Sequence, residues 1–203
     1  MTIKSLSHSS LTDNLFYRSM LAGNTAYIPF TSDFELLESV VVPSTQAEIE
    51  FTNVNTKYAA DYHHLQLRTQ IKTNQSSGSA LYANVIIRLN SDGGTNYSVH
   101  NMQGNGSTRT SGGAGSLAYG LDIPGAGNSS SHYAPAIIDI INPFDTTNNT
   151  TLRATAARFE SNAVGVYSGA WYNTAAVTTI TFDIVQAASF LAGSTINLYG
   201  FRK

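Results

Sequence analysis

The sequence predicts an all-β protein, a jelly-roll-like antiparallel β-sandwich preceded by an N-terminal arm that is extended or forms a short helix. Apolar and polar residues alternate with a period of two along many short segments from Phe34 onward. Turn-forming residues separate these segments, and Ser, Thr and Asn account for 62 of the 203 residues. The chain has no helix-period run of comparable strength, which favours a sandwich over an α/β fold.

Residues 1–30 are predicted to be an anchoring arm, and residues 31–203 the sandwich domain. Thr12 or Asp13 is suited to cap a short helical stretch that stops at Gly23. Such a short helix is marginal by itself, so we expect the arm to dock onto a neighbouring subunit. The residues expected to make this contact are Phe16, Tyr17, Met20, Leu21 and Tyr27.

The first half of the domain contains the clearest strand patterns. Segments 34–42 and 48–51 are predicted strands. In the next strand one face carries Leu65, Leu67, Thr69 and Ile71, and the other face carries Gln66, Arg68, Gln70 and Lys72. This strand should therefore have one face in the core and one in water. Segment 81–90 is apolar on both faces and is predicted to be covered on both sides.

Residues 90–96 have the composition of a tight turn, and we expect them to join segments 81–90 and 97–102 in a β-hairpin. Asn90 and Asp92 superficially resemble ligands of a calcium loop. The further carboxylates and the terminal bidentate Glu of such a loop are missing, so a plain turn is favoured.

Segment 104–127 is rich in glycine and poor in large apolar residues, and is predicted to be a surface loop with a strand-like alternation near its end. It lacks the Gly-Lys-Ser/Thr sequence and the helix start of a phosphate-binding loop. The remaining predicted strands are segments 136–142, 152–159, 164–172, 177–185 and 195–201.

Composition argues against several partners and cofactors. With 11 basic and 13 acidic residues there is no basic stripe for nucleic acid, and no apolar run is long enough to span a membrane. The chain has no cysteine, and its five histidines have no metal-ligand spacing, so no metal or other cofactor is expected. We also expect no catalytic residues and no enzyme activity, because no nucleophile elbow and no paired carboxylates are visible.

Two side chains deserve separate mention because they are aromatic and four residues apart on one strand. Tyr167 and Trp171 should lie on one face, with Gly165 and Gly169 beside them. Such a patch is able to stack on a sugar ring, but packing against a loop or an identical subunit is the favoured interpretation. Asp139 is flanked by isoleucines and is expected to face outward.

Several segments, taken in order, resemble a group of small virion proteins of tailed phages, notably phages of cyanobacteria and other aquatic bacteria. The resemblance spans nearly the whole chain, and its last part is the most telling. The segments are residues 17–24 (YRSMLAGN), 26–29 (AYIP), 34–38 (FELLE), 62–68 (YHHLQLR), 88–93 (RLNSDG), 96–98 (NYS), 105–107 (NGS), 137–140 (IIDI), 171–177 (WYNTAAV), 193–194 (GS) and 198–201 (LYGF).

This resemblance implies a jelly-roll domain that trimerises and sits on the phage particle. The leading expectation is a capsid cement or decoration protein on the outer surface of the virion head, with itself and the major capsid protein as partners. Three arms on one trimer would multiply modest contacts into strong binding. The alternative is a tail-fibre or tail-tip component that binds a host surface glycan through segment 104–127 or through Tyr167 and Trp171.

Overall fold

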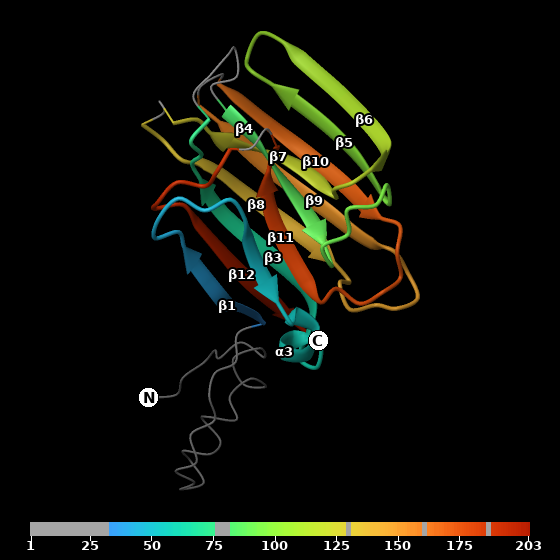
Figure 1. Ribbon diagram of the computed structural model, residues 1–203. Helices are drawn as coiled ribbons and strands as arrows, with labels where there is room; N and C mark the ends of the chain where they lie inside the picture. Colours follow the sequence, from blue (N-terminus) through green and yellow to red (C-terminus); the bar gives the residue numbers. More distant parts are fainter. Residues whose placement is uncertain (1–32, 76–81, 129–130, 160–161, 186–187) are drawn as a thin grey trace, which may run out of the picture. The chain divides into compact units, whose positions relative to one another are not determined.

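The computed structural model describes residues 33–75, 82–128, 131–159, 162–185 and 188–203. Within these residues the chain forms twelve strands and one short helix (Figure 1). In chain order the elements are β1 (Phe34–Val41), β2 (Ile49–Thr52), α3 (Val54–Tyr58), β3 (Tyr62–Ile71), β4 (Tyr82–Leu89), β5 (Tyr97–Gly104), β6 (Arg109–Leu117), β7 (Leu121–Ala126), β8 (Ala134–Ile141), β9 (Thr150–Arg158), β10 (Ala163–Trp171), β11 (Thr179–Ile184) and β12 (Thr195–Arg202).

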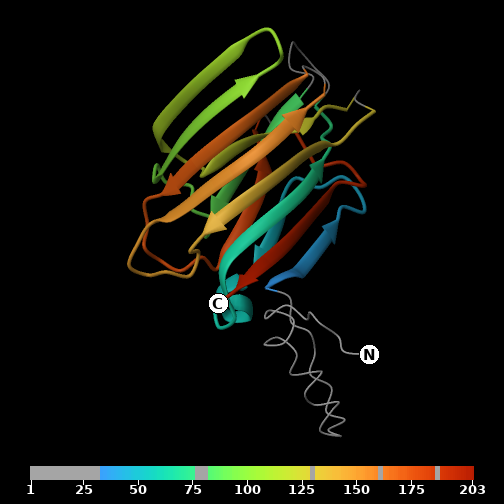
Figure 2. The ribbon, with the colours of Figure 1, turned by 180° about the vertical axis from the view of Figure 1, so that it is seen from behind.

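The strands form two antiparallel sheets that face each other. The large sheet has the order β1-β12-β3-β8-β9-β10-β5-β6, and the small sheet has the order β2-β11-β4-β7. Figure 1 shows the small sheet in front, and Figure 2 shows the large sheet from the opposite side. The predicted class, an all-β, jelly-roll-like sandwich, is confirmed.

The core lies between the sheets and is built by the predicted alternation. Residues 66, 68 and 70 of β3 point away from the core, whereas Thr69 is only 4% exposed and Leu65, Leu67 and Ile71 are fully buried. They pack in the same core as Val85 and Ile87 of β4. Segment 81–90 was predicted to be covered on both faces, and Ile86 on the other face of β4 is indeed only 4% exposed.

The predicted hairpin between segments 81–90 and 97–102 is wrong. β4 pairs with β11 and β7 in the small sheet, whereas β5 pairs with β10 and β6 in the large sheet. The turn forms, but it carries the chain from one sheet to the other. Tyr97 fastens the crossing, because its hydroxyl accepts a hydrogen bond from the Leu89 amide at 3.0 Å and donates one to the Leu89 carbonyl at 3.1 Å.

The prediction of a surface loop over residues 104–127 is wrong for most of the segment, although the strand-like alternation near its end does correspond to a strand, β7. This segment forms β6, the edge strand of the large sheet, and β7, the edge strand of the small sheet. Residues 109–116 are exposed on both faces of β6, so the sequence has no alternation there to reveal a strand. The glycines of this segment also argued against a strand, because glycine weakens strands.

A close backbone approach holds this segment onto the large sheet. A Cβ atom on Gly169 of β10 would lie 1.8 Å from the carbonyl oxygen of Gly120, which follows β6. Only glycine fits at position 169. The contact fixes where the chain passes from β6 to β7 and therefore shapes the space between these strands.

Candidate functional site

The outward face of the large sheet carries a row of side chains in register across five strands. Arg68 of β3 is opposite Ile137 of β8, which is opposite Thr155 of β9. Thr155 is in turn opposite Val166 of β10, and Val166 is opposite Met102 of β5. Side chains in register on one face of neighbouring strands lie close together. This row is therefore a continuous strip of surface.

A second row lies beside the first and is also uncharged. It consists of Pro135 of β8, Ala157 of β9 and Val164 of β10. The six apolar residues of the two rows are called here the outer-face patch: Met102, Pro135, Ile137, Ala157, Val164 and Val166. The exposed fractions of four of them are 61% for Met102, 46% for Ile137, 57% for Val164 and 47% for Val166. Contiguous exposed apolar surface of this kind marks interaction sites in soluble proteins.

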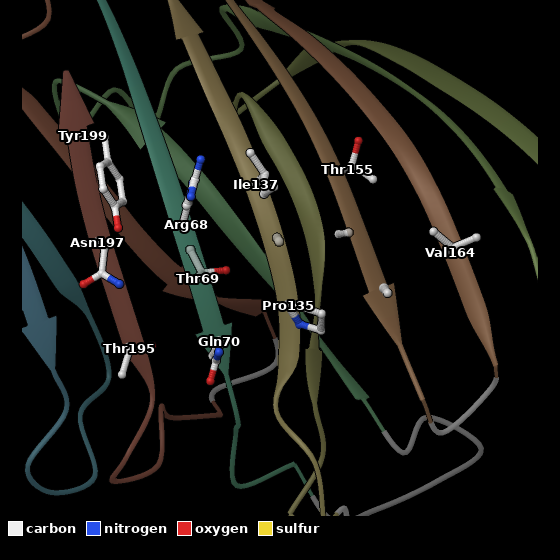
Figure 3. Close-up of a pocket in the computed structure, with 13 residues that line it drawn as sticks. Arg68, Thr69, Gln70, Pro135, Ile137, Thr155, Val164, Thr195, Asn197 and Tyr199 are labelled. Atoms are coloured by element: carbon white, nitrogen blue, oxygen red, sulfur yellow. The ribbon is translucent and has the colours of Figure 1, made fainter. Parts of the chain in front are cut away.

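The surface over the patch is hollowed. A groove of about 430 Å³ runs over β12, β3, β8, β9 and β10, with Ile137, Thr155 and Val164 on one side and Tyr199 and Asn197 on the other (Figure 3). A second hollow of about 330 Å³ is lined by Met102, Val164 and Val166, with Arg109 at its edge. Both hollows contain Val164, so they adjoin each other.

A polar cluster borders the patch on the same face. Asp139 accepts hydrogen bonds from Gln66 Nε2 at 2.9 Å and from Arg153 Nη2 at 2.7 Å, and His64 Nε2 lies 3.5 Å away. Burial opposes the charge of Asp139, but these partners together hold the pKa of its carboxyl below the ordinary value. Burial also lowers the pKa of His64, against the pull of Asp139. Asp139 faces outward as predicted.

On the far side of the groove an arginine packs on two aromatic rings. Phe34 and Tyr199 stack with their ring centroids 4.8 Å apart. The Arg68 guanidinium lies 5.0 Å from the centre of the first ring and 5.1 Å from the centre of the second. This arrangement holds the arginine at the rim of the groove.

The interpretation of Tyr167 and Trp171 as one flat patch for a sugar requires correction, because Trp171 packs inside the protein, in line with the favoured packing interpretation. The two side chains do share one face of β10, but it is the inward face. Trp171 is 1% exposed, stacks near Tyr97 and donates its Nε1 hydrogen to Asp92 Oδ2 at 2.8 Å, so its ring cannot contact a ligand. Tyr167 is partly buried against the core.

The turn at residues 90–96 helps to hold the buried Trp171 side chain, because it contains Asp92. Besides Trp171, Asp92 accepts hydrogen bonds from the Gly94 amide and from Asn96 Nδ2. The Trp171 bond is the largest of the influences that lower the Asp92 pKa. Within the described ranges, no group of three or more His, Asp or Glu side chains is arranged to hold a metal ion.

The predicted arm residues Phe16, Tyr17, Met20, Leu21 and Tyr27 lie outside the described residues. The outer-face patch was missed by the sequence reasoning. Consecutive apolar residues such as Ile137 and Ile138 load both faces of a strand, and this was the available signal. Among the described residues, no helix is long and apolar enough to cross a membrane.

Comparison with known proteins adds little. No protein family matches the chain, and no curated protein matches it either. Among solved structures, botulinum neurotoxin type C, whose uptake by cells depends on interaction with two ganglioside molecules, matches at 11% sequence identity. The match covers 81% of this chain and 42% of that chain, with a TM-score of 0.27. A score this low supports no argument about fold or function.

Proposed function

We propose that this protein is a structural, non-enzymatic component of a bacteriophage virion: a homotrimeric cement or decoration protein of the capsid. The sequence resemblance suggests the particle and the trimer. The observation that carries the proposal is the outer-face patch, an uncharged apolar surface on a regular sheet. In this proposal the patch packs against other copies of the chain, and the arm binds the major capsid protein.

The face is large enough for this role. Eight strands at about 4.8 Å spacing and about eight residues per strand at about 3.3 Å give a face of roughly 1,000 Å². A standard stable interface buries about 800 Å² on each partner. The outward face is therefore large enough to supply one partner's share of a subunit interface.

The charge distribution suits self-association. In a cyclic trimer the patch of one copy packs on a different surface of the next copy, and a charge within the patch would lose its water there at a cost in free energy. The outer-face patch and Thr155 contain no charged residue, while Arg68, Arg153 and Arg109 lie at its border. Of these, Arg68 packs on two aromatic rings and Arg153 pairs with Asp139.

The location is tested by immunogold electron microscopy of intact phage particles with an antibody against this chain. Gold spread over the heads is expected, and gold confined to tail tips or fibres would contradict the capsid assignment. A chain lacking residues 1–30 should still form folded trimers but should no longer bind particles. Undiminished particle binding by that truncated chain would show that the arm is not the anchor.

A further inference from the structure

A separate cavity of about 220 Å³ lies where the two sheets diverge, between the β5–β6 hairpin and the edge strand β7. Its lining includes Asn101 of β5, Asp122 of β7, Tyr167 of β10 and Tyr119 from the connection between β6 and β7. Segment 104–127 and Tyr167 were predicted from the sequence as alternative ligand sites. The structure brings them together in one place and leaves Trp171 out.

Asp122 is the feature of this cavity that needs an explanation. The carboxylate is partly buried, and Asn84 Nδ2 donates a hydrogen bond to its Oδ2 at 2.9 Å. No lysine, arginine or histidine among the described residues forms an ion pair with it. Burial raises its pKa to about 6. A buried charge without a cation costs stability, which is a common property of residues kept for binding.

Two further polar groups line the same cavity. The Asn101 amide and the Tyr119 hydroxyl make no side-chain hydrogen bond with any residue of the described chain. Burial raises the pKa of Tyr119, and the charge of Asp122 raises it further. Leu117, Leu121 and the Tyr167 side chain supply the apolar part of the wall.

This combination selects one class of ligand. Asp122 requires a hydrogen-bond donor, whereas an amide and a phenol both donate and accept. A ligand with several hydroxyl groups satisfies all three, and its C–H surface can pack on the Tyr167 ring. An anion would be repelled by Asp122, and a simple ammonium ion has no acceptor for Asn101 or Tyr119. The volume is below the roughly 300–1,000 Å³ of sites for drug-sized ligands, so a small ligand fits.

We propose that the cavity bordered by Asn101, Tyr119, Asp122 and Tyr167 binds a single neutral sugar ring. The Asp122 carboxylate accepts hydrogen bonds from ring hydroxyl groups, Asn101 and Tyr119 complete the polar contacts, and the Tyr167 side chain packs against the ring. This site is independent of the outer-face patch and does not depend on the particle to which the chain belongs.

The test is saturation-transfer NMR and calorimetry on the full-length protein with neutral monosaccharides: glucose, galactose, rhamnose and N-acetylglucosamine. At least one should bind at millimolar concentration. Tyr119→Phe, which removes one hydroxyl from the cavity, should weaken its binding roughly tenfold. Tyr172→Phe removes an exposed hydroxyl elsewhere, at a residue that is 55% exposed, and should leave binding unchanged.

Asp122→Asn should abolish the binding. The wild-type affinity should fall as the pH is lowered through about 6, because protonation removes the acceptor charge. His100 also lines the cavity, so the same fall with pH should be seen in His100→Gln. Circular dichroism on each variant checks that it is folded. Failure of all four sugars to bind overturns the proposal. Binding that is unchanged in Tyr119→Phe and Asp122→Asn, or binding of methylammonium in preference to the sugars, overturns it too.

Discussion

At the scale of single residues, Asp139 and Asp122 differ in the hydrogen-bond and charge partners of their carboxylates. Asp139 has an arginine, a glutamine and a histidine beside it, whereas Asp122 has Asn84 as its hydrogen-bond donor. The first pKa is lowered and the second is raised to about 6. The pH dependence of stability should therefore carry opposite contributions from the two groups.

Replacing Asp122 by Asn should stabilise the protein at neutral pH. In the unfolded chain an aspartate has a pKa of about 4, so the folded state binds this proton more tightly. Stability should fall as the pH rises from about 4 to about 6 and then level off. The free energy of unfolding of Asp122→Asn should exceed that of the wild type by about 1–3 kcal/mol at pH 7 and by almost nothing near pH 4. Urea denaturation at the two pH values measures this.

Asp145 provides a control of opposite sign for that measurement. Hydrogen bonds from Asn148 and Thr147 lower its pKa to about 2, so its contribution is present above the unfolded pKa and is lost on acidification. Asp145→Asn should reduce stability at pH 7. If both variants shift stability in the same direction, the explanation of the Asp122 pKa by burial is wrong.

Asp92 should be important to the core although it sits in a surface turn. Its Oδ2 atom is the acceptor for the Nε1 hydrogen of Trp171. Asp92→Ala leaves that buried donor without a partner, which should cost about 1–3 kcal/mol. Denaturation followed by the fluorescence of Trp171, the single tryptophan of the chain, reports both the loss and any change around the indole. An unchanged midpoint and spectrum would show that this bond does not hold the turn.

At the scale of elements, the strands were predictable because alternation records which face is buried. In β3 and β9 the buried residues occur at every second position, so a pattern in the chain is enough to identify them. Pairing was less predictable: the turn 90–96 was recognised, but its strands belong to different sheets. Turn composition shows that the chain changes direction, whereas the choice of partner depends on distant strands such as β11.

The candidate sites were less predictable than the strands. Strand β6 has no inward face, so neither it nor the cavity beside it can be derived from periodicity. In β10 the aromatic residues 167 and 171 drew attention, yet they point inward and Val164 and Val166 point outward. The position of the second sheet decides which of two apolar faces is covered. That position cannot be predicted from the sequence of one strand.

The contact between Gly169 and Gly120 gives a prediction about the passage from β6 to β7. In Gly169→Ala the new Cβ atom would lie 1.8 Å from a backbone oxygen, so the backbone must move. The expected loss is at least about 2 kcal/mol in thermal or urea denaturation. Gly115→Ala in β6 meets nothing within 4 Å and should change stability by no more than about 0.5 kcal/mol. Equal effects of the two substitutions would contradict the close approach.

At the scale of the whole molecule, the two faces of the large sheet have different roles. The inward face makes the core with the small sheet, and the outward face presents apolar side chains to water. Apolar residues left exposed in the monomer become favourable when subunits associate, because their removal from water contributes about 25 cal/mol per Å². An isolated chain is therefore not expected to be the functional state.

The most direct test of this central claim is the mass of the full-length protein in solution, measured by light scattering after size exclusion. The wild type should have the mass of three 21.7-kDa chains. Val166→Glu places a charge in the outer-face patch and should give a folded single chain. Thr52→Glu, at an exposed position of β2 in the small sheet and so away from the patch, should remain trimeric. A wild type of single-chain mass, or a trimer that survives Val166→Glu, would contradict the account.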